Sequence, residues 1–290
     1  GGQGQTFRDN SAQMTTQHSL TSTLAAYIRR AIEAAGGWIG FDEYMALALY
    51  TPGQGYYAND LRKFGTMPAG VKGGGSDFVT APEMTPLFGQ TLAVQVAQAL
   101  EITQTREVWE FGAGSGALAL QLLDALDALG AAVQTYTIVD LSGTLRERQQ
   151  QALAAHAARV RWVSALPATL TGVLIGNEVL DAMPVKLLVR KGGVWHERGV
   201  GCEADPAGGA SRFVWQDRPT ALRPPVEIAG EHDYLTEIHP QAEAFMRTLT
   251  GTLTRGAAFF IDYGFPEAEY YHAQRHMGTV MCHRGHLADP

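Results

Sequence analysis

Cysteine is scarce in this chain: Cys202 and Cys282 are the only two among 290 residues. They form no C-x-x-C pair and cannot build a disulfide framework, which favours a reducing compartment. No apolar run approaches the roughly 18 residues that a membrane span requires, and the amino end shows no secretory signal. From these absences we expect a cytoplasmic protein without a membrane span.

Basic side chains are also in deficit, with 22 Lys and Arg against 29 Asp and Glu and a formal net charge of −7. This balance argues against nonspecific binding of nucleic acid, because phosphate backbones select positive surfaces. An acidic surface is compatible with a basic protein substrate. The hydrophobic content of 46% and the length are ordinary for an enzyme with a sizeable core.

Turn and helix signals predict three regions along the chain. Residues 1–13 are polar and glycine-rich, and we interpret them as a vector-derived remnant or a disordered segment before a natural start at Met14. Residues 14–105 form an N-terminal helical and loop region, and residues 106–290 form the core. In the N-terminal region we expect helices over 21–35, 41–49 and 83–100 and a mobile loop over 59–76.

Apolar periodicity predicts an α/β core, typical of a Rossmann-like parallel sheet. After the fourth strand, residues 185–216 are expected to form a β insertion, with a hairpin over 185–198 and a third strand over 212–215. The expected core strands cover 107–111, 134–140, 160–164, 172–177 and 256–262, and the expected helices cover 117–129, 143–158 and 240–253.

The most informative segment links the first core strand to its helix. It holds Glu110, then Gly112, Gly114 and Gly116. Glycines permit a tight turn and let a ligand approach backbone N–H groups at the positive end of a helix. Gly112, Gly114 and Ala117 also fit the dinucleotide pattern G-x-G-x-x-A, but the Glu110 carboxylate would repel a pyrophosphate. It suits a cationic ligand, such as the amino group and sulfonium of S-adenosylmethionine. A turn without any ligand is the alternative.

A second strand end carries Asp140, which lies 24 residues after Gly116. In doubly wound folds an acidic residue about 20 residues beyond the glycine turn binds ribose hydroxyls, because a carboxylate can accept both hydroxyl hydrogens. We therefore expect Asp140 and the adjacent Leu141 to contact the cofactor. The alternative is that Asp140 caps the next helix, although Ser142 is the better cap.

A third group of polar residues, Asn177, Glu178 and Asp181, follows the fourth strand. Polar side chains at the carboxyl ends of parallel strands face the active crevice of such folds. We therefore expect these three residues at the same site as the glycine turn and Asp140. Capping of a helix or turn is the alternative for Asp181.

The pattern E-x-G-x-G-x-G at 110–116 resembles the first motif of class I methyltransferases. The pattern N-E-x-x-D-A-M-P at 177–184 is similar to the MidA-like family of S-adenosylmethionine-dependent methyltransferases. The family usually extends well beyond a pair such as Asp289-Pro290, so we expect this chain to lack the last strands of its sheet and to be less stable than a longer form. Other segments that resemble the family are Tyr44–Tyr57, Ser76–Glu83 with Phe88-Gly89, Phe260–Gly264 and Gln274–His286.

This resemblance implies a class I methyltransferase fold and S-adenosyl-L-methionine as the cofactor, bordered also by Thr80, Pro82, Glu83 and Asn177. Mitochondrial members of the family are complex I assembly factors that methylate arginine in a partner subunit. The resemblance therefore implies an arginine-bearing protein substrate, such as a respiratory-complex subunit. It also implies a location in the mitochondrial matrix if the source is eukaryotic.

Arginine as a methyl acceptor would need carboxylates that pair with the guanidinium in bidentate geometry. Glu178 and Asp181 are the first candidates for this catalytic role, and Glu83 is the third. Asn177 would contact the methionine part of the cofactor or orient the nucleophile. The alternative for Glu83 is a partner of a helix dipole. Tyr263 either walls the substrate channel or is a buried tyrosine with a satisfied hydroxyl.

The tail gathers residue types that bind zinc, but their spacing fits no common structural zinc site, and we expect no metal. Asp262, Tyr263 and His286 form an alternative hydrogen-bonded set that would line the cleft. The residues in the tail that are of zinc-binding types are His272, His276, Cys282, His283 and His286.

The leading interpretation is therefore a methyltransferase acting on a protein arginine. Two other functions stay open. One is an NAD-dependent oxidoreductase built on the same turn, against which Glu110 and the lack of a hydride-transfer constellation count. The other is a non-catalytic assembly factor or chaperone that retains the cofactor pocket, against which the intact Asn177-Glu178 pair argues.

Overall fold

The structure is a computed structural model that describes residues 23–55, 80–140, 143, 145–280, 282–284 and 287–289, the last two ranges as backbone alone. The expected segment 1–13 and the expected loop 59–76 lie outside the described residues. Contacts divide the chain into two compact units. Unit 1 takes its residues from Gly1–Asn59, Pro184–Pro240 and Pro266–Val280, and unit 2 from Asp60–Met183, Gln241–Phe265 and Met281–Pro290. The boundaries at 14–105 and 106–290 stay a proposal from the sequence.

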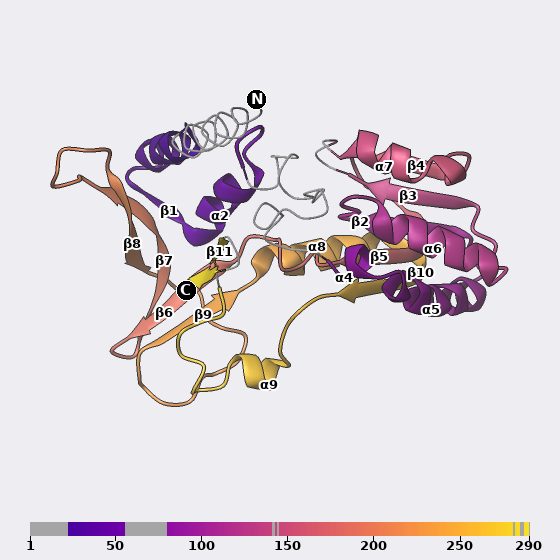
Figure 1. Ribbon diagram of the computed structural model, residues 1–290. Coiled ribbons are helices and arrows are strands. Elements are labelled where there is room, and N and C mark those ends of the chain that lie inside the picture. The colour runs from indigo at the N-terminus through magenta and orange to yellow at the C-terminus, as the bar shows by residue number, and fades with distance from the viewer. Residues whose placement is uncertain are drawn as a thin grey trace, which may run out of the picture. The chain divides into compact units, whose positions relative to one another are not determined.

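Unit 2 is built on a parallel sheet in the order β10-β5-β2-β3-β4. The chain starts in the centre with β2, moves to one side, and returns to the other side with β5 and β10, so a topological switch point lies between β2 and β5. The predicted Rossmann-like sheet is thus confirmed (Figure 1). The strands are β2 (Glu107–Phe111), β3 (Thr135–Val139), β4 (Val160–Val163), β5 (Leu170–Asn177) and β10 (Leu253–Ile261).

Helices cover both faces of this sheet, which explains why its strands are apolar on both sides. Val108 faces a buried cluster shared with α5 and α6, whereas Trp109 and Phe111 face a second cluster with Leu249 of α8. The helices of unit 2 are α4 (Ala81–Met84), α5 (Leu87–Thr103), α6 (Ala117–Ala128), α7 (Arg146–Ala152), the 3-10 helix η2 (Ala154–His156) and α8 (Pro240–Thr252).

The helix expected over 83–100 is wrong in its boundaries, because the chain breaks between α4 and α5. Thr85 is extended, with φ −157° and ψ 142°, as is favoured for a residue that precedes a proline. α5 then packs closely on α6, where the Gly89 N–H donates to Gln121 Oε1 at 3.1 Å and Gln121 Nε2 donates to the Pro82 carbonyl at 2.6 Å. Gln121 therefore fixes both α4 and α5.

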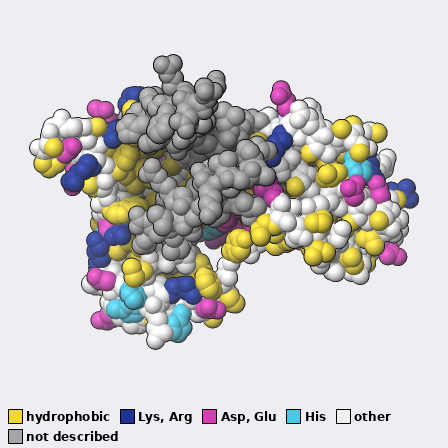
Figure 2. Space-filling view, in the orientation of Figure 1, with side chains coloured by type: hydrophobic (Ala, Val, Ile, Leu, Met, Phe, Trp, Pro, Cys, Tyr) yellow, Lys and Arg dark blue, Asp and Glu magenta, His cyan; other side chains and the backbone are white. Residues whose placement is uncertain are grey.

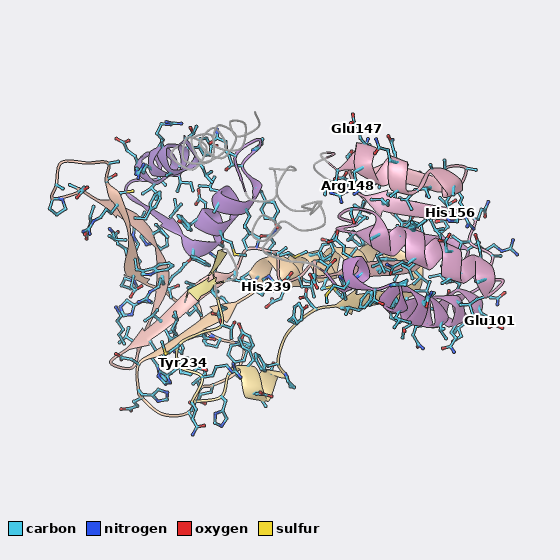
Figure 3. All side chains as sticks on the ribbon, viewed as in Figure 1. Glu101, Glu147, Arg148, His156, Tyr234 and His239 are labelled. Atoms are coloured by element: carbon cyan, nitrogen blue, oxygen red, sulfur yellow. The ribbon has the colours of Figure 1, made fainter. Side chains whose placement is uncertain are left out.

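α6 is tied to η2 by a charged network at the surface. His156 Nε2 lies 2.7 Å from Asp124 Oδ1, and Arg159 pairs through two nitrogens with Asp127. His156 is labelled in Figure 3, and Figure 2 shows a histidine in the same corner beside acidic and basic side chains. Arg159 Nη2 donates to His156 Nδ1 at 2.9 Å, so His156 Nε2 carries the proton that is shared with Asp124.

Unit 1 holds an antiparallel sheet in which β7 pairs with β6, β8 and β1, and β6 also pairs with β9. The hairpin predicted over 185–198 and the strand after it are confirmed, and they continue further than expected. β1 and β9 were not predicted. The elements are β1 (Trp38–Gly40), α2 (Phe41–Tyr50), β6 (Lys186–Lys191), β7 (Val194–Glu203), β8 (Arg212–Pro219), β9 (Tyr234–Ile238) and α9 (Glu267–Tyr270).

A buried carboxylate fastens the segment 266–280 to β9. Glu237 is 4% exposed. It accepts hydrogen bonds from Tyr270 Oη at 2.6 Å and from the N–H groups of Thr279 and Val280 at 2.6 and 3.0 Å. Gly278 is at φ +73°, and a Cβ there would lie 2.6 Å from Glu237 Oε1. The segment that resembles the family therefore has a structural role in unit 1. In the last described part, β11 (Cys282–Arg284) pairs with β12 (Leu287–Asp289).

Gly172 provides a test of the strand spacing in unit 2. It lies in β5 at φ +122°, and a Cβ there would be 2.2 Å from the Glu107 carbonyl oxygen of β2. We expect Gly172→Ala to lower the free energy of unfolding by about 2–4 kcal/mol through backbone strain and overpacking. Gly251 of α8 has nothing within 4 Å of a built Cβ. Gly251→Ala should be neutral or stabilise by up to about 1 kcal/mol. Equal midpoints for the two variants in urea denaturation would contradict this account.

Candidate active site

The turn from β2 to α6 holds three glycines in a conformation that other residues rarely adopt. Gly112, Gly114 and Gly116 have φ of 63°, 53° and 85°, in the left-handed region where a Cβ is costly. Gly116 is the N-cap of α6, and its N–H donates to the Ala113 carbonyl at 2.8 Å. A Cβ on Gly112 would lie 3.1 Å from Val179. The turn therefore packs directly against the loop that follows β5.

A glutamine that the sequence analysis did not single out supports this turn. Gln149 of α7 is 2% exposed. Its Nε2 donates to the Gly114 carbonyl at 2.9 Å, and its Oε1 accepts a bond from Trp162 Nε1 at 2.8 Å. Through these two hydrogen bonds, Gln149 links the Gly114 carbonyl of the turn to Trp162 of β4. Nothing in the sequence marks Gln149, since its partners come from two other elements.

Glu110 lies in the interior of unit 2, beside the turn. It is 2% exposed, and Tyr136 Oη of β3 donates to its Oε2 at 2.7 Å. Burial raises the pKa of Glu110 from 4.5 to about 7, against the opposing effect of the Tyr136 hydrogen bond. Glu110 thus has a protein partner that the sequence did not indicate. Its expected contact with a cofactor stays a prediction.

Asp140 follows β3 at the edge of the sheet that also carries the glycine turn. Its N–H donates to the Val163 carbonyl at 2.9 Å, and its Oδ1 accepts the Gly143 N–H at 2.9 Å. The alternative in which Asp140 caps the next helix is wrong, because α7 begins at Arg146 with Leu145 as its N-cap. That helix is also shorter than the expected 143–158. The predicted contact residue Leu141 lies outside the described residues.

The end of β5 places Asn177 and Glu178 beside the end of β10. Asn177 pairs with Ile261, and the Glu178 N–H donates to the Ile261 carbonyl at 2.9 Å. Glu178 has φ +52°. For a residue with a side chain this conformation costs about 1–3 kcal/mol and persists only where the surroundings over-determine it. The chain bends at Glu178 and then reverses locally in a turn, in which the Met183 N–H donates to the Leu180 carbonyl at 3.2 Å.

Asp262 binds the backbone of that reversal. Its Oδ2 accepts the N–H groups of Leu180 and Asp181 at 2.9 and 3.0 Å, and its Oδ1 accepts the Tyr263 N–H at 2.8 Å. The Asp181 carboxyl in turn accepts the Ala182 N–H, as in the turn-cap alternative. The set expected with Asp262 included His286, which lies outside the described residues.

Four carboxylates meet at this edge of unit 2. Burial raises the pKa of Glu178, and Asp181, Asp262 and Glu83 raise it further, while a hydrogen bond from Tyr263 lowers it. Burial and Asp262 likewise raise the pKa of Asp181. Glu83 is in the first turn of α4, consistent with the dipole alternative. Among the described residues none of the four forms an ion pair. The site is therefore suited to a cation.

Tyr263 completes the cluster from the end of β10. It is 80% exposed, so the alternative of a buried tyrosine is wrong. The Glu178 charge raises the pKa of Tyr263, and the two side chains are hydrogen-bonded. Of the predicted residues on α4, Glu83 is near enough to raise the pKa of Glu178. Thr80 is the N-cap of α4, and Pro82 is buried in its first turn.

Other features of the described residues do not coincide with the predicted site residues. A groove of about 530 Å³ in unit 2 has Glu107, Trp109 and Arg161 in its wall, and none of the predicted site residues lines it. Within the described residues no group of three or more His, Cys, Asp or Glu side chains is arranged to hold a metal ion. The side chains of Cys282, His283 and His286 lie outside that description. Of the helices that the structure describes, none has the length and apolarity needed to cross a bilayer.

A sequence profile described as "Putative S-adenosyl-L-methionine-dependent methyltransferase" matches residues 91–290, more than half of the chain. The chain belongs to this family. The predicted recognition is thus confirmed, and with it the class I methyltransferase-like fold.

Relatives support the same assignment. A Burkholderia thailandensis protein, crystallised with S-adenosyl-homocysteine, is 52% identical and superposes with a TM-score of 0.84 over 94% of this chain and 70% of its own. The Caenorhabditis elegans protein named "Protein arginine methyltransferase NDUFAF7 homolog, mitochondrial" is 26% identical over 82% of this chain. Human protein arginine methyltransferase NDUFAF7 is 26% identical over 79% of this chain. The chain spans 61% and 56% of the lengths of these two proteins.

The buried Glu110 of this methyltransferase-family chain makes its stability depend on pH. Because its pKa is raised from 4.5 to about 7, the native state keeps a proton that the unfolded chain has already lost. Glu110 therefore lowers stability as pH rises through this window, by up to about 3 kcal/mol. Glu110→Gln stays neutral, so its unfolding free energy should fall less between pH 5 and pH 8.

Urea denaturation at the two pH values measures this change. For each variant the unfolding free energy at pH 8 is compared with its own value at pH 5. Any cost of burying the glutamine amide that does not depend on pH therefore cancels. Glu101→Gln on the exposed side of α5 (Figure 3) is the control and should follow the wild type. A drop in Glu110→Gln equal to that of the wild type would show that Glu110 is ionised throughout.

Proposed function

We propose that this chain is an S-adenosyl-L-methionine-dependent methyltransferase and that its acceptor is a protein arginine. The observation that carries the proposal is the meeting, at one edge of unit 2, of the glycine turn with a carboxylate cluster that has no basic partner among the described residues. The packing of Gly112 against Val179 joins the two parts. The Burkholderia relative that holds S-adenosyl-homocysteine supports the cofactor.

The residues at this edge fit the cofactor. The backbone of Gly112, Gly114 and Gly116, which carries no side chains, would lie against it. Asp140 would bind its ribose hydroxyls, and Leu141 would also contact it. Asn177 would border its methionine part, as would Thr80, Pro82 and Glu83 on α4. Glu110 would act on the positive methionine end from inside the sheet. When bound, the cofactor supplies a methyl group on a positively charged sulfur, and the protein mainly positions the reactants.

The acceptor proposal rests on charge. Glu178 and Asp181 would hold a guanidinium in bidentate geometry, with Glu83 and Asp262 adding negative potential. Burial is the main cause of the raised pKa of Glu178 and Asp181, and repulsion from neighbouring carboxylates adds to it. A cation would relieve this repulsion. The attacking nitrogen must also lose a proton, and a carboxylate with a raised pKa can accept it. The names of the mitochondrial relatives support arginine as the acceptor.

The partner would be an arginine-bearing protein, such as a subunit of a respiratory complex. We place the reaction in the cytoplasm, or in the mitochondrial matrix if the source is eukaryotic. A non-catalytic assembly factor that retains the cofactor pocket is the second candidate, and it would bind the cofactor without transferring its methyl group.

Calorimetry with S-adenosylmethionine, S-adenosyl-homocysteine and NAD separates the candidates. A methyltransferase binds the first two, and tight binding of NAD alone would overturn the proposal. Transfer is then followed with methyl-labelled cofactor and a synthetic peptide of Gly-Arg-Gly repeats, with the matched Gly-Lys-Gly peptide as a control. Cofactor binding without label on the arginine peptide would contradict the arginine acceptor and leave the cofactor proposal standing.

Asp140→Ala tests the ribose contact. The loss of charge-assisted hydrogen bonds should weaken S-adenosyl-homocysteine binding by about 1.5–3 kcal/mol, which is about 10- to 150-fold in Kd. Asp205→Ala is the control, because the Asp205 carboxylate also accepts a backbone N–H, from Ala207 at 3.0 Å, in an exposed loop of unit 1. If both variants bind like the wild type, Asp140 does not hold the ribose.

Glu178→Gln tests the acceptor site, since it keeps the size of the side chain and removes its charge. We expect the Kd for S-adenosyl-homocysteine to change less than twofold, while methyl transfer falls at least tenfold, or about 1.4 kcal/mol of transition-state stabilisation. Glu101→Gln should leave both quantities unchanged. Normal transfer by the variant would make Glu178 structural and pass the role to Asp181 or Glu83.

A further inference from the structure

Asp262 makes three hydrogen bonds that require a carboxylate. Oδ2 accepts two N–H groups, from Leu180 and Asp181, and Oδ1 accepts the N–H of Tyr263. An asparagine has one oxygen and one NH₂ group, and the NH₂ group cannot accept. Whichever way the amide is turned, its NH₂ group would face at least one of these backbone N–H groups, and two donors cannot form a hydrogen bond. The negative charge here has a cost, because it raises the pKa of both Glu178 and Asp181.

Two of these bonds join loops whose bonded residues are 82 and 81 positions apart in sequence. The Glu178 N–H binds the carbonyl of Ile261, the residue before Asp262, and the Glu178 carboxylate binds the hydroxyl of Tyr263, the residue after it. Glu178 thus lies in its left-handed conformation between fixed points on both sides. Since such a conformation persists only when its surroundings impose it, the geometry of Glu178 depends on the loop 261–263.

We propose that Asp262 is a positioning residue of the methyl-transfer site: it fixes the reversal at 178–181 so that the Tyr263 hydroxyl holds the Glu178 carboxylate in one direction. The role of this direction in transfer rests on the proposed function. The positioning itself is a property of unit 2 and needs no acceptor. Asp262 acts through Glu178, so removing either residue should remove the same link.

The ring titration of Tyr263 reports this link directly. The groups that face the pair are Asp181 on the same reversal, Asp262 after β10, and Glu83 on α4. In the wild type the neighbouring Glu178 raises the pKa of Tyr263. NMR of ¹³C-labelled tyrosine, with Tyr263→Phe to assign the signal, should show the pKa of Tyr263 falling toward its ordinary value in Asp262→Asn and in Glu178→Gln.

A double-mutant cycle separates positioning from simple loss of charge. The Asp262 charge also raises the pKa of Tyr263 directly, as the smallest of the causes. If Asp262 acts mainly through Glu178, Asp262→Asn therefore lowers the pKa of Tyr263 less in the Glu178→Gln background than in the wild type. If Asp262 acts only by its own charge, the two shifts add, and the proposal fails. Asp205→Ala, which removes a carboxylate with a similar backbone bond elsewhere, should leave the Tyr263 titration unchanged.

Kinetics with the Gly-Arg-Gly peptide extend the test to catalysis. Asp262→Asn should lower kcat at least tenfold with less than a twofold change in the Kd of S-adenosyl-homocysteine. If this variant does not fold, Tyr263→Phe replaces it, because the exposed side chain tolerates loss of a hydroxyl. The rate of methyl transfer by Tyr263→Phe should be lower than that of the wild type. Adding Glu178→Gln to Tyr263→Phe should not lower the rate further. The inference is overturned if Asp262→Asn has the kcat of the wild type. The same holds for Tyr263→Phe if it has to be used in place of Asp262→Asn. Failure of the wild type to bind S-adenosyl-homocysteine overturns the proposed function and leaves the titration result valid.

Discussion

The turn between β2 and α6 requires positive φ at Gly112, Gly114 and Gly116, and only glycine adopts this conformation at little cost. That requirement decides the direction of α6 and leaves the backbone bare where a ligand would approach. Gln149 can then reach the Gly114 carbonyl from α7, and Val179 can pack on Gly112 from the far side of the switch point. Every other part of the candidate site is placed relative to this turn.

Parallel pairing then brings distant residues to the same edge. Phe111 of β2 is level with Val139 of β3 and Gly176 of β5, and Asn177 is level with Ile261 of β10. The carboxyl ends of β3, β5 and β10 are therefore followed by Asp140, Glu178 and Asp262, so that separate segments bring carboxylates to one edge of the sheet. Because the strands are fixed by buried apolar side chains on both faces, the places where they end follow from the core. The direction of the Glu178 carboxylate depends in addition on its bonds to the loop 261–263.

The sequence predicted those features that depend on local pattern. Apolar runs predicted the strands, the glycines predicted the turn, and the polar residues after the strands predicted that Asp140, Asn177 and Glu178 follow the carboxyl ends of β3 and β5. It could not predict contacts that need a tertiary partner. Gln149, the Glu110–Tyr136 pair and the β9 strand of unit 1 are of this kind. The break between α4 and α5 was missed although Pro86 is its local signal, since the apolar spacing on both sides continues across it.

Glu178 depends both on local sequence pattern and on tertiary contacts. Its charge and place after β5 follow from the sequence. Its φ of 52° and its bond to Tyr263 need tertiary partners, which are the Ile261 carbonyl and the Asp262 carboxylate on the backbone of the reversal. An accumulation of like charges without a basic partner among the described residues destabilises the free protein, and strain at a non-glycine residue adds to that. Binding of a cation would offset the repulsion. A single cationic group that bridges Glu178 and Asp181 would neutralise the repulsion and use the imposed direction. Under the proposed function, this gain on binding would explain why the fold maintains an arrangement of like charges that is unfavourable in the free protein.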